Sequence, residues 1–469
     1  MLKGFVKITE KNLHIIFIGS LFLIYSGIYL YYGDALFVAS GLQDWNYVHH
    51  DDTRSNWDIW KNDIGGTIGV KNYHLVSMSY WLPILISDLT GIPTIFLFRL
   101  QVLLFHPSVV YIFYKITSLV YKNNWDRVLP CVLLALGSWN IFRVSLTGEG
   151  FHLFFGYYAQ DFFIFFLLAL YFFLKKAVKI TGLFIFFGIL IHPAMGVPVG
   201  GFLIMAWWFI FKDSKLYPFI TLMAFAIAGV ATELILLKIV FPPDIPIVEP
   251  EIIWDIIMNH GHMNLFHTHQ LIFFQFSVVI FFLATCSYNI CEHKIIKKLI
   301  LLGGGWLVLM FLVYLTGYLG KIPDIMRLQA LRFSNSFLFI IFLGVQYPKT
   351  RAKGMVFVFF VAMLFGVHSL LSPWPAKELI IPKLPAVFTI VMITGIVLLM
   401  LFIRKLSVNF KKHHIDGIRT SFIIFLIGIT LASPVIRWSR AVDNRVLRIE
   451  EAMNFAASNL KGNKIFLLW

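Results

Sequence analysis

Charged residues are scarce in this chain, and cysteines are scarcer still. Only 13% of the 469 residues are Asp, Glu, Lys or Arg, whereas 59% are hydrophobic. A soluble protein of this length cannot hide that much apolar surface. The three cysteines, Cys131, Cys286 and Cys291, form no CxxC pair. The sequence therefore predicts neither a disulfide framework nor a cysteine-based metal site.

The short motifs of several enzyme classes are also missing. The chain has no GxxxxGK[ST] phosphate loop, no HExxH pair and no GxSxG elbow. Nucleotide binding through a phosphate loop, zinc proteolysis and α/β-hydrolase chemistry therefore have no support. Obvious inverted halves are absent too, which weakens the interpretation as a secondary transporter.

Long hydrophobic runs are what the chain has in abundance. Runs of about 17–25 residues, each enough for a helix to cross a hydrocarbon core, recur along its length. The predicted fold class is therefore all-α, a polytopic transmembrane bundle of about 13 spans. The expected spans lie near 13–32, 94–121, 128–145, 157–174, 181–193, 195–211, 217–241, 270–291, 299–317, 335–347, 355–372, 384–403 and 421–437.

The distribution of charge predicts the orientation of this bundle. The chain has 39 Lys and Arg against 24 Asp and Glu, and the basic residues gather in every second connection, as in 175–179 and 404–419. This is the positive-inside pattern of membrane proteins, so no nucleic-acid partner is expected. The topology is predicted as N-in and C-out. It requires His192-Pro193 to break the stretch 181–211 into a hairpin of two short helices.

The expected domain organisation is one bundle followed by a short tail. Residues 1–437 form the bundle, with outer loops at 33–93, 242–269 and 318–335. Within the first loop, Tyr73 to Gly91 is half apolar and predicts an amphipathic helix in the membrane interface. Residues 438–469 are an outer C-terminal tail or the start of a truncated extracytoplasmic domain.

The first outer loop holds the strongest candidates for chemistry. His49, His50, Asp51 and Asp52 follow the first span directly. Adjacent carboxylates can hold a divalent cation, or one of them can act as general base on an acceptor hydroxyl, so Asp51 and Asp52 are the candidate catalytic residues. The alternative is a solvated loop, in which acidic residues are ordinary.

Histidines are unusually frequent in the second outer loop. His260 and His262 form one HxH pair, and His267 and His269 form another. Alternate residues of an extended segment face one side, so such a pair can supply two ligands to a transition metal. A divalent metal held by Asp51, His260 and His262 is one hypothesis. Binding of substrate by His267 and His269, together with His49 and His50, is another, and ordinary loop histidines are the third.

Three further ionisable residues are candidates for substrate binding. Arg327 and Arg332 lie together in the third outer loop, and guanidinium groups match the oxygens of a lipid phosphate. Their alternative role is solvation at the membrane surface. Asp161, at the outer end of its span, is expected to face a cavity below the first loop.

The arrangement resembles the GT-C class of polytopic membrane glycosyltransferases. Four features carry the resemblance: the acidic loop with Asp51-Asp52 after span one, the stretch from Tyr73 through Leu89-Thr-Gly-Ile-Pro93 to Phe98-Arg-Leu100, the break at His192-Pro193, and Leu328-Gln-Ala-Leu-Arg-Phe333 before a late span. The tail Glu450 to Trp469 is similar to the start of an outer domain in related membrane families. The HHDD segment is not the DxD of the oligosaccharyltransferase branch, and no WWD triplet follows.

The resemblance implies a sugar donor carried on polyprenyl phosphate. It implies a catalytic Asp in the first outer loop, here Asp51 or Asp52, and a basic residue near the carrier phosphate, here Arg327 or Arg332. The expected protein is a multi-pass glycosyltransferase of the plasma or inner membrane that has membrane lipids and the lipid-linked sugar as partners. The acceptor is an envelope glycan, lipid or protein. The alternatives are a transporter or flippase of a lipid-linked or polar solute, a metal-dependent membrane enzyme, and a GT-C-like protein without catalytic activity.

Overall fold

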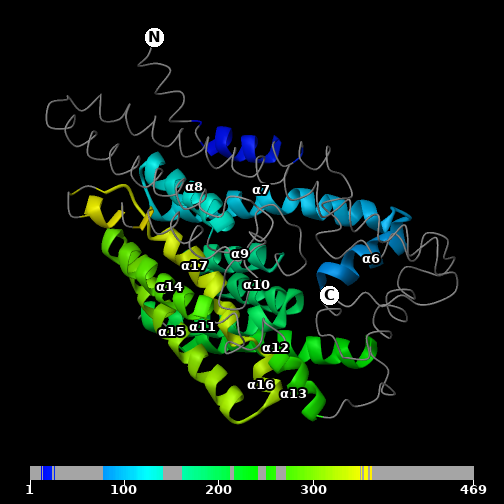
Figure 1. Cartoon of the computed structure of the whole chain (residues 1–469). Coiled ribbons are helices and arrows are strands. Elements are labelled where there is room, and N and C mark those ends of the chain that lie inside the picture. Colours follow the sequence, from blue (N-terminus) through cyan, green and yellow to red (C-terminus); the bar gives the residue numbers. More distant parts are fainter. Residues whose placement is uncertain are drawn as a thin grey trace, which may run out of the picture.

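The architecture is a bundle of helices (Figure 1). The computed structural model describes residues 12, 14–23, 26, 78–140, 161–211, 216–240, 250–259, 271–348, 350, 353–357 and 360–361, and no strand occurs among them. The principal helices are α6 (Met78–Thr90), α7 (Thr94–Val120), α8 (Asn124–Asn140), α9 (Phe162–Leu174), α10 (Val178–Ile191), α11 (Pro193–Ile210), α12 (Leu216–Val240), α13 (Pro250–Asn259), α14 (Leu271–Ile290), α15 (Lys294–Leu319), α16 (Pro323–Arg327), η5 (Ala330–Arg332) and α17 (Phe333–Leu343).

Four segments of these helices are long and apolar enough to cross a membrane, judged by length and composition within the described residues. They are Leu103–Val120, Pro193–Ile210, Leu216–Leu236 and Lys294–Leu319. The described residues also contain shorter apolar helices, among them His14–Leu23, Phe162–Leu174 and Val178–Ile191. The all-helical class and the apolar helices agree with the sequence-based prediction. The spans expected at 384–403 and 421–437 lie outside the described residues.

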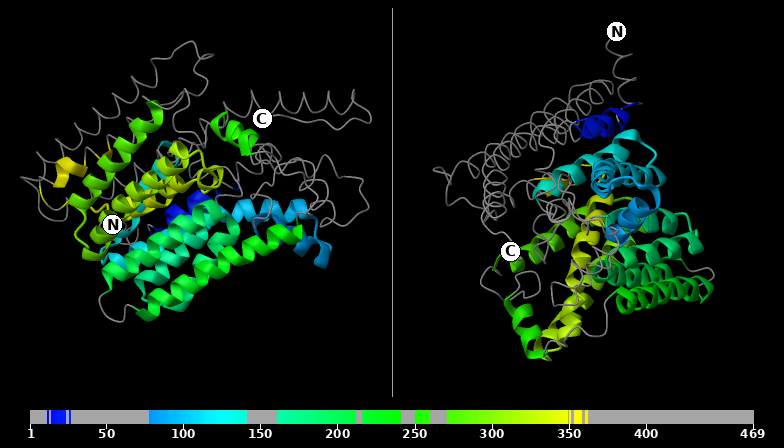
Figure 2. Two further views of the ribbon diagram at one scale, coloured as in Figure 1. Left: turned by 90° about the horizontal axis from the view of Figure 1, so that it is seen from below. Right: turned by 90° about the vertical axis from the view of Figure 1, so that its right-hand side faces the viewer.

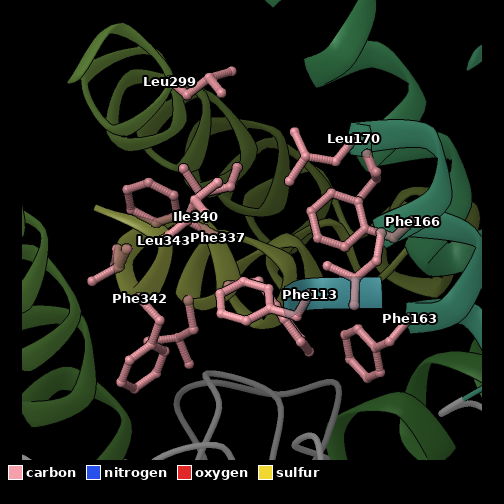
Figure 3. Close-up of a cluster of buried hydrophobic side chains, with 14 of the residues drawn as sticks. Phe113, Phe163, Phe166, Leu170, Leu299, Phe337, Ile340, Phe342 and Leu343 are labelled. Atoms are coloured by element: carbon pink, nitrogen blue, oxygen red, sulfur yellow. The ribbon is translucent and has the colours of Figure 1, made fainter. Parts of the chain in front are cut away.

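Helix α17 is the centre of the bundle. All of its residues from Phe333 to Leu343 are buried. Phe339 packs on Phe113 of α7 and on Phe163 and Phe166 of α9, with ring centroids between 5.1 and 6.1 Å apart. Figure 3 shows this aromatic and aliphatic core, in which side chains of α7, α9, α15 and α17 converge. From Phe337 to Leu343 the helix is apolar on every side, and such a segment is stable only when protein or lipid surrounds it completely.

Helices α10 and α11 form the hairpin that His192-Pro193 predicts. Pro193 has no backbone N–H and cannot continue α10, so α10 ends at Ile191 and Pro193 starts α11. A Cβ built on Gly196 would lie 2.6 Å from the Cα of Ile189, and one on Gly200 would lie 3.0 Å from Ile185. The two helices therefore run antiparallel and in close contact. The left-hand view of Figure 2 shows α10, α11 and α12 side by side.

Contacts between neighbouring helices show the relative directions of α7, α9 and α11. Gln101 of α7 bonds Asp161 at the start of α9, and farther along both helices Phe113 of α7 and Phe166 of α9 pack on the same ring of Phe339, so these two helices are parallel. Lys176, which follows α9, places its Nζ 5.3 Å from the ring of Phe211, which follows α11. The ends of α7, α9 and α11 consequently lie at one end of the bundle.

The segments that follow α14 and α17 lie at the same end of the bundle. The Tyr121 hydroxyl donates to the carbonyl oxygen of Leu343 at 2.5 Å, and the backbone N–H of Tyr347 donates to Asp126 at 2.9 Å. Lys353 and Glu292 form an ion pair of 2.8 Å. We call the described residues of the segments 121–127, 175–179, 291–298, 344–348, 350 and 353 the basic end. They carry Lys122, Arg127, Lys175, Lys176, Lys179, Lys294, Lys297, Lys298 and Lys353.

Parts of the expected outer loops are helical. The loop 33–93 contains α6, so a helix is present within the stretch Tyr73 to Gly91, and its expected place in the membrane interface stays a prediction. The loop 242–269 contains α13, whose Trp254 packs on Tyr318 at the end of α15. The segment 318–335, expected as a loop, contains α16, η5 and the first residues of α17, and it is buried from Gln329 onward. Burial was not foreseen there because Arg332 and the polar residues 334–336 suggest a solvated segment.

Candidate functional site

Arg332 is a buried cation at the start of the central helix. It ends η5 and precedes α17, and only 2% of its surface is exposed. Gln329, in the left-handed conformation with φ 44°, turns the chain before it, and the Arg332 N–H donates to the Gln329 carbonyl at 2.8 Å. A buried charge is expensive unless it has hydrogen-bond partners, so this position indicates a specific role rather than surface solvation.

The partner of Arg332 is the histidine at the break between α10 and α11. Arg332 Nη1 lies 2.6 Å from His192 Nε2, although 140 residues separate them in the chain. His192 is itself buried, with 1% exposed. Its backbone is extended, with φ −155° and ψ 91°, because it joins the end of one helix to the start of another. Sequence reasoning treated this histidine as part of a helix break and did not connect it with Arg332.

Asp161 lies at the same level of the bundle as His192. It precedes α9, is 9% exposed, and accepts a hydrogen bond from Gln101 Nε2. Gly188 of α10 packs on Phe162 and Phe165 of α9, and α9 and α10 are antiparallel. Asp161 therefore lies within one helical turn of the level of His192.

Glu233 of α12 brings a second carboxylate to this level. Gly229 packs on Ile189 and Phe225 on Gly182, so α12 runs parallel to α10 and Glu233 is level with the end of α10 and with His192-Pro193. Its side chain is 3% exposed, and neither carboxylate oxygen accepts a hydrogen bond from the described residues. We call Asp161, His192, Glu233 and Arg332 the polar layer. It lies at the ends of α9, α10 and α17 that face away from the basic end, and α12 and α15 extend beyond it.

Small polar side chains extend the polar layer into the first turn of α17. Ser334, Asn335 and Ser336 are all buried, and Gln329 just before them is 6% exposed. The Ser334 and Ser336 hydroxyls and the side-chain Oε1 of Gln329 make no hydrogen bond within the part of the chain that the structure describes. The start of α17 is thus a buried region rich in hydrogen-bonding groups beside a guanidinium, a combination suited to an anionic or strongly polar ligand.

The structure describes only part of the site predicted from the sequence. Asp161 and Arg332 share the polar layer, and the backbone of Arg327 ends α16 five residues earlier. The remaining predicted residues lie outside the described residues: His49, His50, Asp51, Asp52, His260, His262, His267 and His269. The expected approach of the first loop to the histidine loop therefore stays a prediction.

The predicted metal site falls on those same segments. Asp51, His260 and His262 are outside the described residues, and the described part of the chain contains no group of three His, Cys, Asp or Glu side chains that could hold a metal ion. Glu233 lies outside the site predicted from the sequence. Its burial without a hydrogen-bond partner is a finding of the tertiary structure, and its position inside a long apolar run is the sequence signal that points to it.

Comparisons of the chain with protein families, with curated proteins and with solved structures find no match. The functional assignment therefore rests on the residues and their geometry.

Proposed function

We propose that this chain is a polytopic membrane glycosyltransferase of GT-C type. It moves a sugar from a polyprenyl-phosphate carrier to an envelope glycan, lipid or protein at the outer face of the plasma or inner membrane. The four membrane-length helices and the separation of the basic end from the polar layer support this function. By the positive-inside rule the basic end is cytoplasmic, so the polar layer lies toward the outer face.

The observation that carries the proposal is the buried guanidinium of Arg332 at the start of α17. The polyprenyl chain of a lipid-linked donor stays in the membrane and keeps the attached phosphate close to it. A protein that binds this phosphate needs a cation within its membrane-embedded part. The planar guanidinium matches two phosphate oxygens. The hydroxyls of Ser334 and Ser336 supply further hydrogen-bonding groups for a phosphate or a sugar.

The proposed reaction needs one base and one stabilised leaving group. Asp51 or Asp52 removes the proton from an acceptor hydroxyl, whose oxygen forms a bond to the anomeric carbon of the sugar. The bond from that carbon to the phosphate oxygen breaks, and the polyprenyl phosphate leaves with the electron pair. Arg332 stabilises the negative charge that develops on the phosphate. Asp161 is placed to hydrogen-bond the sugar or the acceptor.

Mass spectrometry tests this function directly. Polyprenyl-linked sugars and surface glycans are compared in cells with and without the gene, and in cells that carry Arg332→Ala. We expect one sugar-loaded carrier to accumulate and one glycan or lipid to lose that sugar in the deletion, and the same change in Arg332→Ala at normal protein level. Unchanged carriers and glycans in the deletion would contradict the proposal.

Glu233 favours a second candidate function, transport of a lipid-linked or polar solute. An unpaired carboxylate within a helix of membrane length is typical of a substrate or ion path. The position of Glu233 at the level of His192 fits an outer-face site as well, so we rank transport second. Reconstituted vesicles decide between them, because a transporter moves solute across the bilayer and the transferase only alters it at one face.

A further inference from the structure

We propose that His192 is a positioning residue for Arg332. Its neutral imidazole holds in place the guanidinium group that binds the phosphate of the lipid carrier. This inference rests on the proposed function, because it assigns a role within the same phosphate site. It adds a residue that the resemblance to GT-C enzymes does not assign.

The first step of the argument is chemical. A guanidinium only donates hydrogen bonds, so at 2.6 Å from Arg332 Nη1 the His192 Nε2 atom must accept. An accepting Nε2 carries no proton, and the ring therefore holds its single proton on Nδ1. The contact selects one tautomer of the neutral imidazole. An imidazolium at this position would set two cations against each other.

The second step concerns the rigidity of His192. Its N–H donates to the Gly188 carbonyl at 3.1 Å, and its own carbonyl accepts from Met195 at 3.0 Å and Gly196 at 2.7 Å. Both helices of the hairpin thus hold its backbone. Arg332 follows a left-handed turn, and its flexible side chain gains a fixed acceptor from this hairpin. Fixing the plane of a guanidinium before the ligand arrives reduces the entropy lost on binding.

The third step is the electrostatic setting. The ionisable groups on the described helices that pack against α10 and α11 near this level are Arg332, Asp161 of α9 and Glu233 of α12. Asp88 of α6 is exposed. Asp161 already accepts a hydrogen bond from Gln101. Neutral His192 can satisfy Arg332 without neutralising its charge, whereas a carboxylate in its place would cancel the charge that attracts the phosphate.

The experiment measures binding of a defined probe to the purified full-length protein. Polyprenyl monophosphate is titrated, with polyprenol as the probe without phosphate and phosphatidic acid as an ordinary anionic lipid. Thermal stabilisation reports binding, because a ligand that binds only the folded protein raises its stability. The variants are His192→Gln, whose side-chain oxygen can accept near the position of Nε2, and His192→Phe, which keeps a flat ring without an acceptor.

We expect the wild-type protein to prefer polyprenyl phosphate over both other lipids. His192→Phe should weaken phosphate binding by about tenfold or more, since a hydrogen bond to a charged group contributes about that much. His192→Gln should restore most of the lost affinity, and binding of polyprenol should not change in either variant. Equal phosphate affinity in all three proteins would overturn the positioning role while leaving the donor site intact. If the wild-type protein bound polyprenyl phosphate no better than polyprenol or phosphatidic acid, the proposed function itself would be overturned.

A pH series keeps the inference testable if His192→Phe does not fold. Acidification from about pH 8 to about pH 5 crosses the range in which an imidazole takes up a proton. We expect the preference of the wild type for the phosphate lipid to fall over this range, because protonation removes the acceptor, and His192→Gln to lose less. A larger loss in His192→Gln, or tighter wild-type binding in acid, would show that the imidazole does not act by accepting from Arg332.

Discussion

Gly196 packs directly against the backbone of Ile189, so closely that a Cβ on Gly196 would lie 2.6 Å from the Ile189 Cα atom. This contact closes the hairpin of α10 and α11 one turn from His192. The approach is between two backbones, and no side-chain rotation can relieve it. The position of the His192 ring therefore depends on the absence of a side chain at residue 196.

Replacing Gly196 by Ala should destabilise the protein. The added methyl group forces the two helices apart, and overpacking of this kind costs about 1–3 kcal/mol. Thermal unfolding of the purified protein in detergent measures the loss. Gly305→Ala is the matched control, because a Cβ there meets nothing within 4 Å and Ala favours helix over Gly. Equal melting temperatures for the two variants would contradict the close packing of the hairpin.

Replacing Arg332 by Lys should weaken binding of a phosphate-bearing lipid, although the charge is kept. An ammonium group cannot reproduce the planar fork of a guanidinium, and its shorter reach withdraws it from His192. We expect about tenfold weaker binding of polyprenyl phosphate and a matching loss of sugar transfer in membranes. Retained affinity and transfer would show that Arg332 acts only as a diffuse positive charge.

Replacing Glu233 by Met should raise the melting temperature. The carboxylate is buried without a hydrogen-bond partner among the described residues, and exchanging such a group for an apolar one of similar length relieves a desolvation cost of about 1–3 kcal/mol. Asp161→Leu is the contrasting variant. It deprives Gln101 of its acceptor and should lower the melting temperature. A destabilising Glu233→Met change would indicate that the carboxylate holds a partner or ligand.

The orientation that we propose for the bundle predicts which residues react from outside the cell. Single cysteines are placed at Lys175, at the basic end, and at Glu251, at the start of α13, since both side chains are exposed. The natural cysteines are buried, which keeps the background low. An impermeant maleimide should label Glu251→Cys in intact cells and Lys175→Cys only after permeabilisation. The reverse pattern would invert the topology and place the polar layer inside.

The predicted catalytic pair calls for a separate test. Asp51→Asn and Asp52→Asn keep the shape of the side chain and remove its charge. Loss of a general base typically lowers the rate by about 10²–10⁴, whereas a substitution in a solvated loop changes stability by only about 0.5 kcal/mol. One variant should accumulate normally in the membrane and fail to transfer sugar. Full transfer by both variants would remove the catalytic assignment from this loop.

Much of the secondary structure was predictable because it depends on local sequence. The expected spans 94–121, 217–241 and 270–291 correspond to α7 (Thr94–Val120), α12 (Leu216–Val240) and α14 (Leu271–Ile290). Apolar run length sets these bounds, and Pro193 sets the break between α10 and α11. Helix α15 was predicted too short at its start. It begins at Lys294 because the long lysine stems can extend toward solvent while their backbone remains helical.

The sequence by itself determined the class of this protein: an excess of apolar residues in long runs, a basic residue set in alternate connections, and a proline that divides one run into two helices. Only the tertiary structure decided which polar residues meet. Arg332 and His192 are 140 positions apart, and nothing local distinguishes a buried arginine from one at the surface. Their contact depends on the packing of α17 against the α10–α11 hairpin, because long-range packing, unlike helix formation, is not encoded within a short stretch of chain.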